Sequence, residues 1–312
     1  MHPPTATKLF PKEFFDESET TPTSSNVHAF NILARVLEDP TFNLTSVPDN
    51  IPSYYSKLVK VQGEAIRAHA SRWTLDEDVD LQGKIEELIW TSAVIYGVGG
   101  MEENGELNAD FFLYVSPVFN TGVRHLFLSL DLILRMHLVT SSIFLFTLFS
   151  RLTRWTSQKI FLKGYLSVTL SWYVGRGRPY LDVARFFQVE LGETLLSARS
   201  KESNIALTLP YNINDARLQI PHSWSPILRS ALMHVDDHVP KLQRALADHA
   251  SRFGDVPKGT FSDTWLKDAQ LIDGSIFLRT AGLTTSRLGW IRDTLATEEG
   301  PSGEWDRRAF FK

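Results

Sequence analysis

Residues 29–37 read AFNILARVL, and this stretch places apolar side chains at the spacing of an α-helix. Pro40 follows and ends the pattern. The same helical spacing recurs along the chain, whereas the apolar–polar alternation that is typical of a sheet is scarce. The further helices that the sequence predicts lie at about 53–73, 84–97, 136–152, 157–174, 180–188 and 225–253. We therefore predict an all-α fold, built as a single mainly helical domain.

The composition predicts that order begins near residue 28. Residues 1–27 hold twelve Ser, Thr or Pro residues, and such a segment buries little apolar surface and is typically disordered. Residues 28–312 then form the helical domain. Within it, residues 197–221 are polar and rich in Asn, which predicts a loop.

The composition also limits the chemistry of this chain of 312 residues. Hydrophobic residues make up 43% of it, which is enough for a sizeable core. The net charge is −4, and this argues against nucleic-acid binding, which usually requires a basic surplus. The chain has no cysteine, so disulfides, cysteine-ligated zinc, iron–sulfur clusters and thiol catalysis are excluded.

The sequence predicts neither a membrane span nor a secretion signal. The longest stretch without Asp, Glu, Lys or Arg runs from Met136 to Ser150 and has 15 residues. A spanning helix needs about 20 apolar residues. The N-terminus has no compact apolar run after a basic patch. We therefore expect a cytoplasmic protein in a reducing compartment, and assign it no oligomeric state.

The stretch HVDDHVPK is the most informative for chemistry. In a helix, His234, His238 and Lys241 would share one face, and two imidazoles four residues apart are a common metal-binding arrangement. Pro240 would disturb that helix and free the carbonyl of Asp236. Lys241 can be a ligand only when neutral or carbamylated, and otherwise it balances the two aspartates. The alternative is a charged, solvated helix face.

Two further helical positions are candidates for the same chemistry. His137 lies in a predicted apolar helix, where it is either a third metal ligand or a core histidine bonded to a backbone carbonyl. Glu86 and Glu87 can add a carboxylate, although exposed helix glutamates are commoner. Neighbours on a helix diverge by about 100°, so these two carboxylates would not face one substrate.

The stretch GRGR is a candidate phosphate site. Arg176 and Arg178 can hold a cofactor phosphate through guanidinium forks and backbone amides. The stretch lacks GxGxxG spacing and follows no predicted strand, so a helix-ending loop is the alternative. No GxSxG motif occurs, and no Ser-His-Asp arrangement is identified. Four aromatic residues form either core or the wall of a pocket for a flat ligand: Trp90, Tyr96, Trp172 and Tyr173.

These segments in combination resemble a known family. The matching stretches are VHAF (27–30), LAR (33–35), KIEELIW (84–90), IYGVGG (95–100), ADFFL (109–113), MHLVTSS (136–142), GRGRP (175–179), HVDDHVPK (234–241), RAL (244–246) and DGS (273–275). Together they resemble the questin oxidase-like family over about residues 27–311. These are fungal oxidoreductases of polyketide and anthraquinone metabolism, related to the Baeyer–Villiger-type oxidase of aflatoxin formation.

The resemblance implies a reaction, cofactors and ligands. It implies O2-dependent oxidation, of Baeyer–Villiger or ring-opening type, of an anthraquinone-like aromatic polyketide, with NADPH as the reductant. Some members use non-haem iron held largely by histidines. On this resemblance, His137, His234, His238 and Lys241 are candidate metal ligands, and Lys241 and His238 are candidate catalytic residues. Iron with an open coordination position would bind O2.

Two departures from the family pattern bear on function. Members carry a longer N-terminal part with further histidines, and this chain is expected to lack that part. Members also run the ADFFL motif almost directly into MHLVTSS, whereas 22 residues, Tyr114 to Arg135, intervene here. We predict that residues 114–135 are an insertion or a translated intron, because codons for Leu113-Tyr114-Val115 can spell a splice donor. The alternative function is a catalytically impaired fragment or a non-catalytic helical protein.

Overall fold

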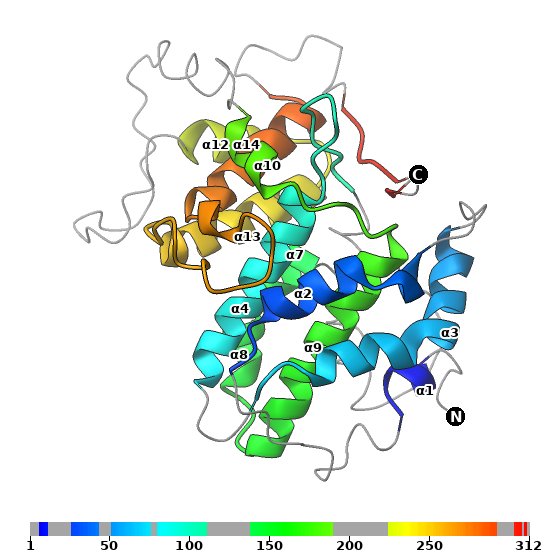
Figure 1. Cartoon of the computed structure of the whole chain (residues 1–312). Helices are drawn as coiled ribbons and strands as arrows, with labels where there is room; N and C mark the ends of the chain where they lie inside the picture. The colour runs from blue at the N-terminus through cyan, green and yellow to red at the C-terminus, as the bar shows by residue number, and fades with distance from the viewer. Residues whose placement is uncertain are drawn as a thin grey trace.

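The architecture is that of packed helices (Figure 1). A computed structural model of the chain describes residues 6–11, 26–43, 51–75, 80–110, 138–189, 224–291, 303–307 and 309–310. Within these residues, β-type pairing is limited to two isolated bridges, Met101 with Leu107 and Asp110 with Asp306. The prediction of an all-α fold is therefore confirmed.

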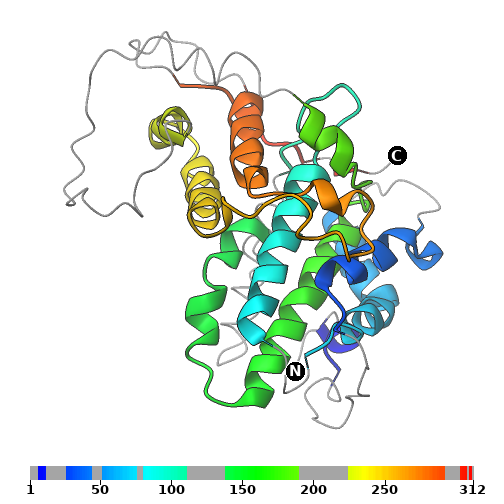
Figure 2. The same ribbon diagram turned by 60° about the vertical axis from the view of Figure 1, so that its left-hand side comes forward.

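Helix α4 lies at the centre of the fold (Figure 2). It begins where the Asp80 carboxylate accepts a hydrogen bond from the Gln82 N–H at 2.9 Å, and it continues directly into a π-helix, η3. The relevant bounds are α4 Leu81–Ala93, η3 Val94–Val98, α2 Ala29–Glu38, α7 Leu138–Ser142, α8 Leu145–Phe149, α9 Trp155–Gly175 and α14 Ser275–Leu288. Helix α4 contacts all of these elements, so its apolar face organises the core.

The long helices of the first half pack as the apolar pattern predicts. Helix α3 (Ile51–Ser71) packs against α9 and α2 (Figure 1). His28 begins α2, because its Nδ1 accepts the Phe30 N–H at 3.0 Å. Asp39 ends α2 and caps the next turn, η2 (Pro40–Phe42). The helices predicted at 29–37, 53–73 and 157–174 are thus confirmed, with ends that differ by a few residues.

Part of the segment that the composition predicts to be disordered is ordered. Ala6–Leu9 form the short helix α1, which packs on α3. Leu9 is buried in the main core. A Cβ at Gly63 of α3 would lie only 3.1 Å from the Leu9 nitrogen, so glycine permits this close approach. The burial of this apolar side chain favours local order around Leu9, and the prediction of disorder for residues 1–27 stays a prediction.

The helix predicted at 136–152 is divided into α7 and α8. A turn at residues 143–144 separates them. The Ser141 and Ser142 hydroxyls donate to the carbonyls of Leu138 and Val139, at 3.5 and 2.6 Å. Serine side chains that bond to nearby backbone compete with a continuous helix. His137 and the predicted insertion at 114–135 lie outside the described residues.

The second half of the chain surrounds the end of α4. Its further elements are α10 Val183–Gln188, α12 Trp224–Leu232, α13 His238–Phe253 and η5 Ala269–Leu271. Helix α13 packs against α14, α12 and α7. It ends at Gly254, as predicted, where the glycine N–H donates to the Ala250 carbonyl at 2.8 Å. Residues 303–307 then pack on the core, and the Asp306 N–H donates to the Ala109 carbonyl at 3.0 Å.

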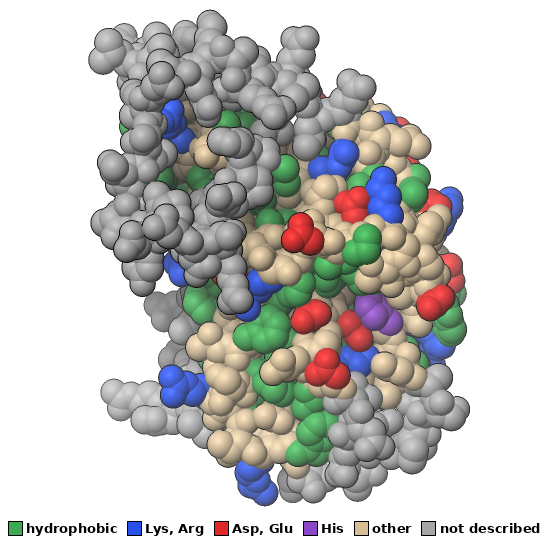
Figure 3. Space-filling model, turned by 90° about the vertical axis from the view of Figure 1, so that its left-hand side faces the viewer, with side chains coloured by type: hydrophobic (Ala, Val, Ile, Leu, Met, Phe, Trp, Pro, Cys, Tyr) green, Lys and Arg blue, Asp and Glu red, His purple; other side chains and the backbone are tan. Residues whose placement is uncertain are grey.

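One hydrophobic core connects these elements. It runs through the described residues from Leu9 to Trp305. Among the described helices, none has the length and apolar character needed to cross a membrane. On the face seen in Figure 3, hydrophobic side chains form a central band with acidic side chains among them, and lysine and arginine are scattered. The described part of this face therefore presents no continuous basic surface.

Candidate functional site

The candidate site lies at the turn between α12 and α13. The single helix predicted across His234 and His238 is wrong, because the helix ends before the first histidine and begins again at the second. Pro240 falls in the first turn of α13, where a missing N–H costs no hydrogen bond. The Asp236 carbonyl is not freed, since it accepts the Val239 N–H at 3.2 Å.

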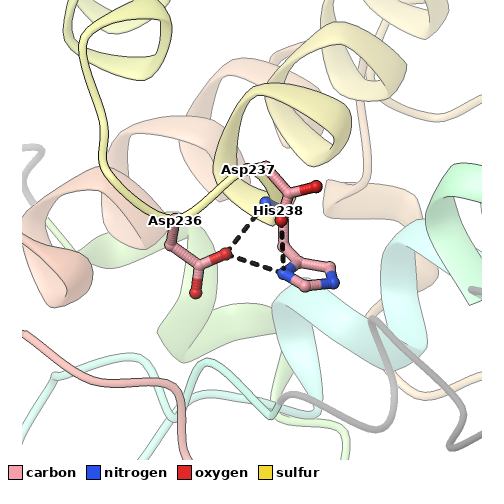
Figure 4. Close-up of side chains that lie close together, drawn as sticks. All are labelled: Asp236, Asp237 and His238. Carbon is pink, nitrogen blue, oxygen red and sulfur yellow. Dashed lines mark hydrogen bonds and ion pairs between the residues drawn. The ribbon is translucent and has the colours of Figure 1, made fainter.

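Asp236, Asp237 and His238 converge at this turn (Figure 4). Nδ1 of His238 lies 2.7 Å from Oδ1 of Asp236 and 3.2 Å from Oδ1 of Asp237. The backbone N–H of His238 donates to the same Asp236 oxygen at 2.9 Å. Ligand atoms of the three residues lie within 4.8 Å of one another, and the His238 side chain is 29% exposed. One imidazole and two carboxylates are thus gathered where solvent reaches them.

Trp305 holds Asp236 from the other side. Its indole Nε1–H donates to Oδ2 of Asp236 at 2.9 Å, and the residue is buried. Burial by itself raises the pKa of the Asp236 carboxyl, but the hydrogen bonds from His238 and Trp305 outweigh burial and lower that pKa. Sequence reasoning missed Trp305, because 69 residues separate it from Asp236 and no local pattern links them.

Lys241 pairs with Asp237 at the surface. Its Nζ lies 2.5 Å from Oδ2 of Asp237, and the two side chains are 50% and 73% exposed. The hydrogen bond from Lys241 lowers the pKa of the Asp237 carboxyl. In this contact Lys241 is an ammonium that balances a carboxylate, which is one of the two roles that the sequence left open. Its roles as ligand and catalytic residue stay predictions.

The two histidines of the turn have opposite hydrogen-bonding patterns. Nδ1 of His234 accepts the Asp236 N–H at 3.0 Å, so a neutral His234 carries its proton on Nε2. That Nε2 atom is buried and has no hydrogen-bond partner among the described residues. Nδ1 of His238 faces two carboxylate oxygens and therefore carries the proton. In its neutral form His238 has its lone pair on Nε2, whereas neutral His234 has an N–H donor there.

Arg176 and Arg178 are engaged inside the protein. Arg176 is fully buried, and its Nε and Nη2 donate to the Asp110 carboxylate at distances of 2.5 to 3.2 Å. Nη1 of Arg178 donates to the carbonyls of Val36 and Asp39 at 3.0 and 2.6 Å. These contacts tie the end of α9 to other segments, as the helix-ending-loop alternative expects. A phosphate on Arg176 would require breaking a buried ion pair.

Glu86 and Glu87 do not form a catalytic pair. Oε2 of Glu87 accepts hydrogen bonds from the Trp73 indole and the Ala29 backbone N–H, both at 2.7 Å. Its Oε1 lies 2.7 Å from Nζ of Lys84, which is buried. Glu87 therefore caps α2 and neutralises an internal lysine.

The four aromatic residues considered for a pocket wall are core residues. Trp90, Tyr96, Trp172 and Tyr173 are all buried. The Tyr173 hydroxyl donates to the Pro179 carbonyl at 2.7 Å, and burial raises the pKa of that phenol. These contacts favour the core alternative.

A buried histidine that sequence reasoning did not single out joins α13 to α7. Nε2 of His249 lies 2.8 Å from the Ser142 hydroxyl, and the neighbouring Ser141 hydroxyl lies 2.8 Å from that of Tyr165 on α9. Burial lowers the pKa of His249 to about 4. Oδ2 of Asp248 is 4.0 Å from Nδ1 of His249, too far for the hydrogen bond of a Ser-His-Asp triad. The periodicity of α13 places His249 on its buried face, which was the available signal.

Comparison with family models shows that the chain belongs to the questin oxidase-like family. The match covers residues 1–126 and 129–246, which includes the whole turn from His234 to Lys241. Comparison with curated proteins gave no match. Membership in this family indicates oxidoreductase activity in general.

The donor atoms of the turn fit a non-haem iron ion. Imidazole nitrogen and carboxylate oxygen are the ligand types of non-haem iron sites that keep open positions for O2. Asp236 and Asp237 gather their carboxylate oxygens around Nδ1 of His238, within 4.8 Å, and the lone pair of a neutral His238 then lies on Nε2. His137, the further ligand that the resemblance implies, lies outside the described residues.

Proposed function

We propose that the protein is an oxidoreductase that uses O2 to oxidise a flat, anthraquinone-like aromatic polyketide in the cytoplasm of a fungus. The observation that carries the proposal is the convergence of His238, Asp236 and Asp237 inside the family-matched range. A search of the described residues for three histidine or acidic side chains with ligand atoms within 4.8 Å of one another finds this group.

The side chains of the turn take distinct parts in the proposed site. Nε2 of His238 would hold the iron, with His137 and Lys241 as the further ligands that the family resemblance adds. Iron supplies the binding and activation of O2 when it is bound. Asp236 keeps the proton of His238 on Nδ1, which leaves the lone pair on Nε2. His234 supports the turn, because its Nδ1 accepts the Asp236 N–H at 3.0 Å.

Two reactions of this class differ in their electron balance. In a Baeyer–Villiger reaction, one oxygen atom enters between a carbonyl carbon and its neighbour. The other oxygen atom leaves as water, formed with a hydride from NADPH and a proton. In a ring-opening dioxygenation, both oxygen atoms enter the product and no external reductant is consumed. We propose the NADPH-dependent reaction, which the family resemblance supports.

The test combines metal content with turnover. The chain is loaded with Fe(II) and compared with His238→Ala and with Asp248→Asn, a matched control. Asp248 is also an exposed aspartate paired four residues along α13, with Arg252 at 3.2 Å. We expect stoichiometric iron in the wild type and the control, and its loss in His238→Ala. We also expect O2 uptake that depends on a hydroxylated anthraquinone.

The stoichiometry separates the alternatives. Equal consumption of NADPH and O2 supports the monooxygenase reaction, and O2 uptake without NADPH supports ring opening. A folded chain that binds no iron and consumes no O2 would overturn the proposal. That outcome would favour the non-catalytic helical protein, in which Lys241 pairs with a surface carboxylate and Arg176 with a buried one.

A further inference from the structure

Residues 303–307 are fixed to the core next to the candidate site. The Asp306 carboxylate accepts hydrogen bonds from Nη2 and Nε of Arg287 at 2.7 and 3.0 Å, and from the Ala109 N–H at 2.9 Å. The Asp306 N–H returns a bond to the Ala109 carbonyl at 3.0 Å. Trp305, the preceding residue, is thus held in place by contacts that do not involve the candidate site.

Trp305 reaches the candidate site from this anchored segment. Its residue exposure is 7%, and its indole N–H donates to Oδ2 of Asp236 at 2.9 Å. An indole N–H can donate but not accept, so this contact favours the ionised form of the carboxyl.

The Asp236 carboxylate is shared between Trp305 and His238. Oδ2 faces the indole, and Oδ1 accepts both Nδ1–H and backbone N–H of His238, at 2.7 and 2.9 Å. Rotation of the carboxylate would break these contacts together. A carboxylate held in this way orients an imidazole and selects its tautomer, as carboxylates beside metal-bound histidines do.

We propose that Trp305 is a positioning residue of the candidate site, which fixes the tautomer and orientation of His238 through Asp236. In that tautomer the lone pair of His238 lies on Nε2. Asp236 acts as the orienting carboxylate, and Asp237 adds a second carboxylate oxygen beside the same Nδ1 atom. The inference rests on the proposed function for its purpose, but its geometry does not depend on a bound metal. Trp305 lies beyond the family-matched range, which ends at residue 246.

The first measurement is the tautomer of His238 in the metal-free chain. The chain has nine histidines, so the imidazole ¹⁵N signals of His238 are assigned by their loss in His238→Gln. Spectra are recorded near pH 8, above the ordinary imidazole pKa of about 6.5. We expect Nδ1–H in the wild type, and a mixture of tautomers in Trp305→Phe. Asp236→Ala should show the same change more fully.

Two controls separate positioning from general damage. Trp290→Phe removes another indole N–H, which donates to the Ser286 hydroxyl at 3.2 Å, and it should leave the tautomer of His238 unchanged. The wild-type indole signal of Trp305 should also move in Asp236→Asn, and this test stands even if Trp305→Phe fails to fold. An unchanged His238 tautomer in folded Trp305→Phe would overturn the proposal, as would an indole signal that ignores Asp236→Asn.

The second measurement uses Co(II) as a spectroscopic probe of metal binding. Loss of a residue that orients a ligand typically weakens metal binding by 10- to 100-fold, and we expect about a tenfold loss in Trp305→Phe, with an altered visible spectrum. If the wild type binds no Co(II), the metal part of the proposed function fails, and the tautomer result still decides the role of Trp305. If the variant binds Co(II) with wild-type affinity and spectrum, the positioning role is wrong.

Discussion

Single residues in this protein carry charges into the core, and each needs a partner there. Lys84 is 1% exposed, and it contacts the Glu87 carboxylate at 2.7 Å and the Asn26 side chain at 2.8 Å. A buried ammonium is costly unless it is paired and hydrogen-bonded. Glu86 and Glu87, the two carboxylates considered for catalysis, therefore differ, because Glu87 neutralises the buried Lys84 and Glu86 does not.

Glu87→Ala should be strongly destabilising. The change leaves the Lys84 ammonium uncompensated and removes the acceptor of the Trp73 and Ala29 N–H groups. We expect the free energy of unfolding to fall by about 3–5 kcal/mol, the usual cost of breaking a buried pair on one side. Urea unfolding followed by circular dichroism measures it. Glu86→Ala is the matched control and should cost far less. Equal losses in the two variants would contradict the assignment.

At the scale of elements, the π-helix η3 is fitted to α14 through a glycine. A Cβ added at Gly97 would lie 2.3 Å from Oγ1 and 3.3 Å from Cγ2 of Thr280. Both residues are buried. The sequence predicts that glycines end the α4 helix, but the structure gives Gly97 the additional task of admitting the Thr280 side chain.

Gly97→Ala should therefore destabilise through overpacking. Extra methyl groups in a well-packed core usually cost about 1–3 kcal/mol of stability. Because the added Cβ would lie only 2.3 Å from Oγ1 of Thr280, we expect a loss near the upper end of that range. In a Thr280→Ala background the clash disappears, so the same change should cost much less. A double-mutant cycle in urea measures the coupling between the two sites. If the effects of Gly97→Ala and Thr280→Ala are additive, the loss of stability comes from the backbone of η3 and not from a clash with Thr280.

The contact between α7 and α13 should make stability depend on pH. His249 has a folded pKa of about 4, against an ordinary value of 6.5. As pH falls from about 6.5 to 4, the unfolded chain binds a proton that the folded chain does not, so stability is lost, by about 3 kcal/mol in total. The loss from Asp39, whose hydrogen bonds lower its pKa to about 2 despite burial, belongs to more acidic conditions.

His249→Gln isolates this term, because an amide can still contact the Ser142 hydroxyl without titrating. Unfolding free energies are measured in urea between about pH 7.5 and 4.5, across the ordinary imidazole pKa. The variant should show a flatter dependence on pH than the wild type. His28, whose pKa burial also lowers, titrates in both proteins, so the difference between them is the relevant quantity. Parallel curves would mean that His249 is not the responsible group.

At the scale of the molecule, local patterns predicted most elements but not their partners. The apolar spacing of residues 29–37 predicted α2 closely, since an amphipathic helix is encoded within its own length. The turn at residues 233–237 was not predicted, because the His234 and Asp236 side chains accept nearby backbone N–H groups and so interrupt a pattern that is typical of a helix.

Local patterns also predicted only part of the candidate site. His238 was singled out from its spacing to His234, although it lies at a turn, whereas the two aspartates were considered only as charges that Lys241 could balance. Trp305 contacts Asp236 across 69 residues, and Arg176 contacts Asp110 across 66. Such pairs depend on how segments meet in space, which no local periodicity records. Arg176 and Arg178 were predicted to bind phosphate because a guanidinium offers the same N–H donors to a carboxylate as to a phosphate.

The Asp306 side chain should hold the segment of residues 303–307 against the core. Asp306→Ala removes a two-nitrogen contact with Arg287 and a bond from the Ala109 N–H. Charge-assisted hydrogen bonds each contribute about 1.5–3 kcal/mol when partly buried, and we expect a total loss of about 3 kcal/mol because the side chain is partly solvated. Urea unfolding gives this value.

Hydrogen exchange should show faster exchange at the backbone amides of Ala109 and Asp306. Glu304→Ala, an exposed neighbour in the same segment, is the control. Unchanged exchange at Ala109 would mean that apolar burial of Trp305, and not Asp306, holds the segment in place.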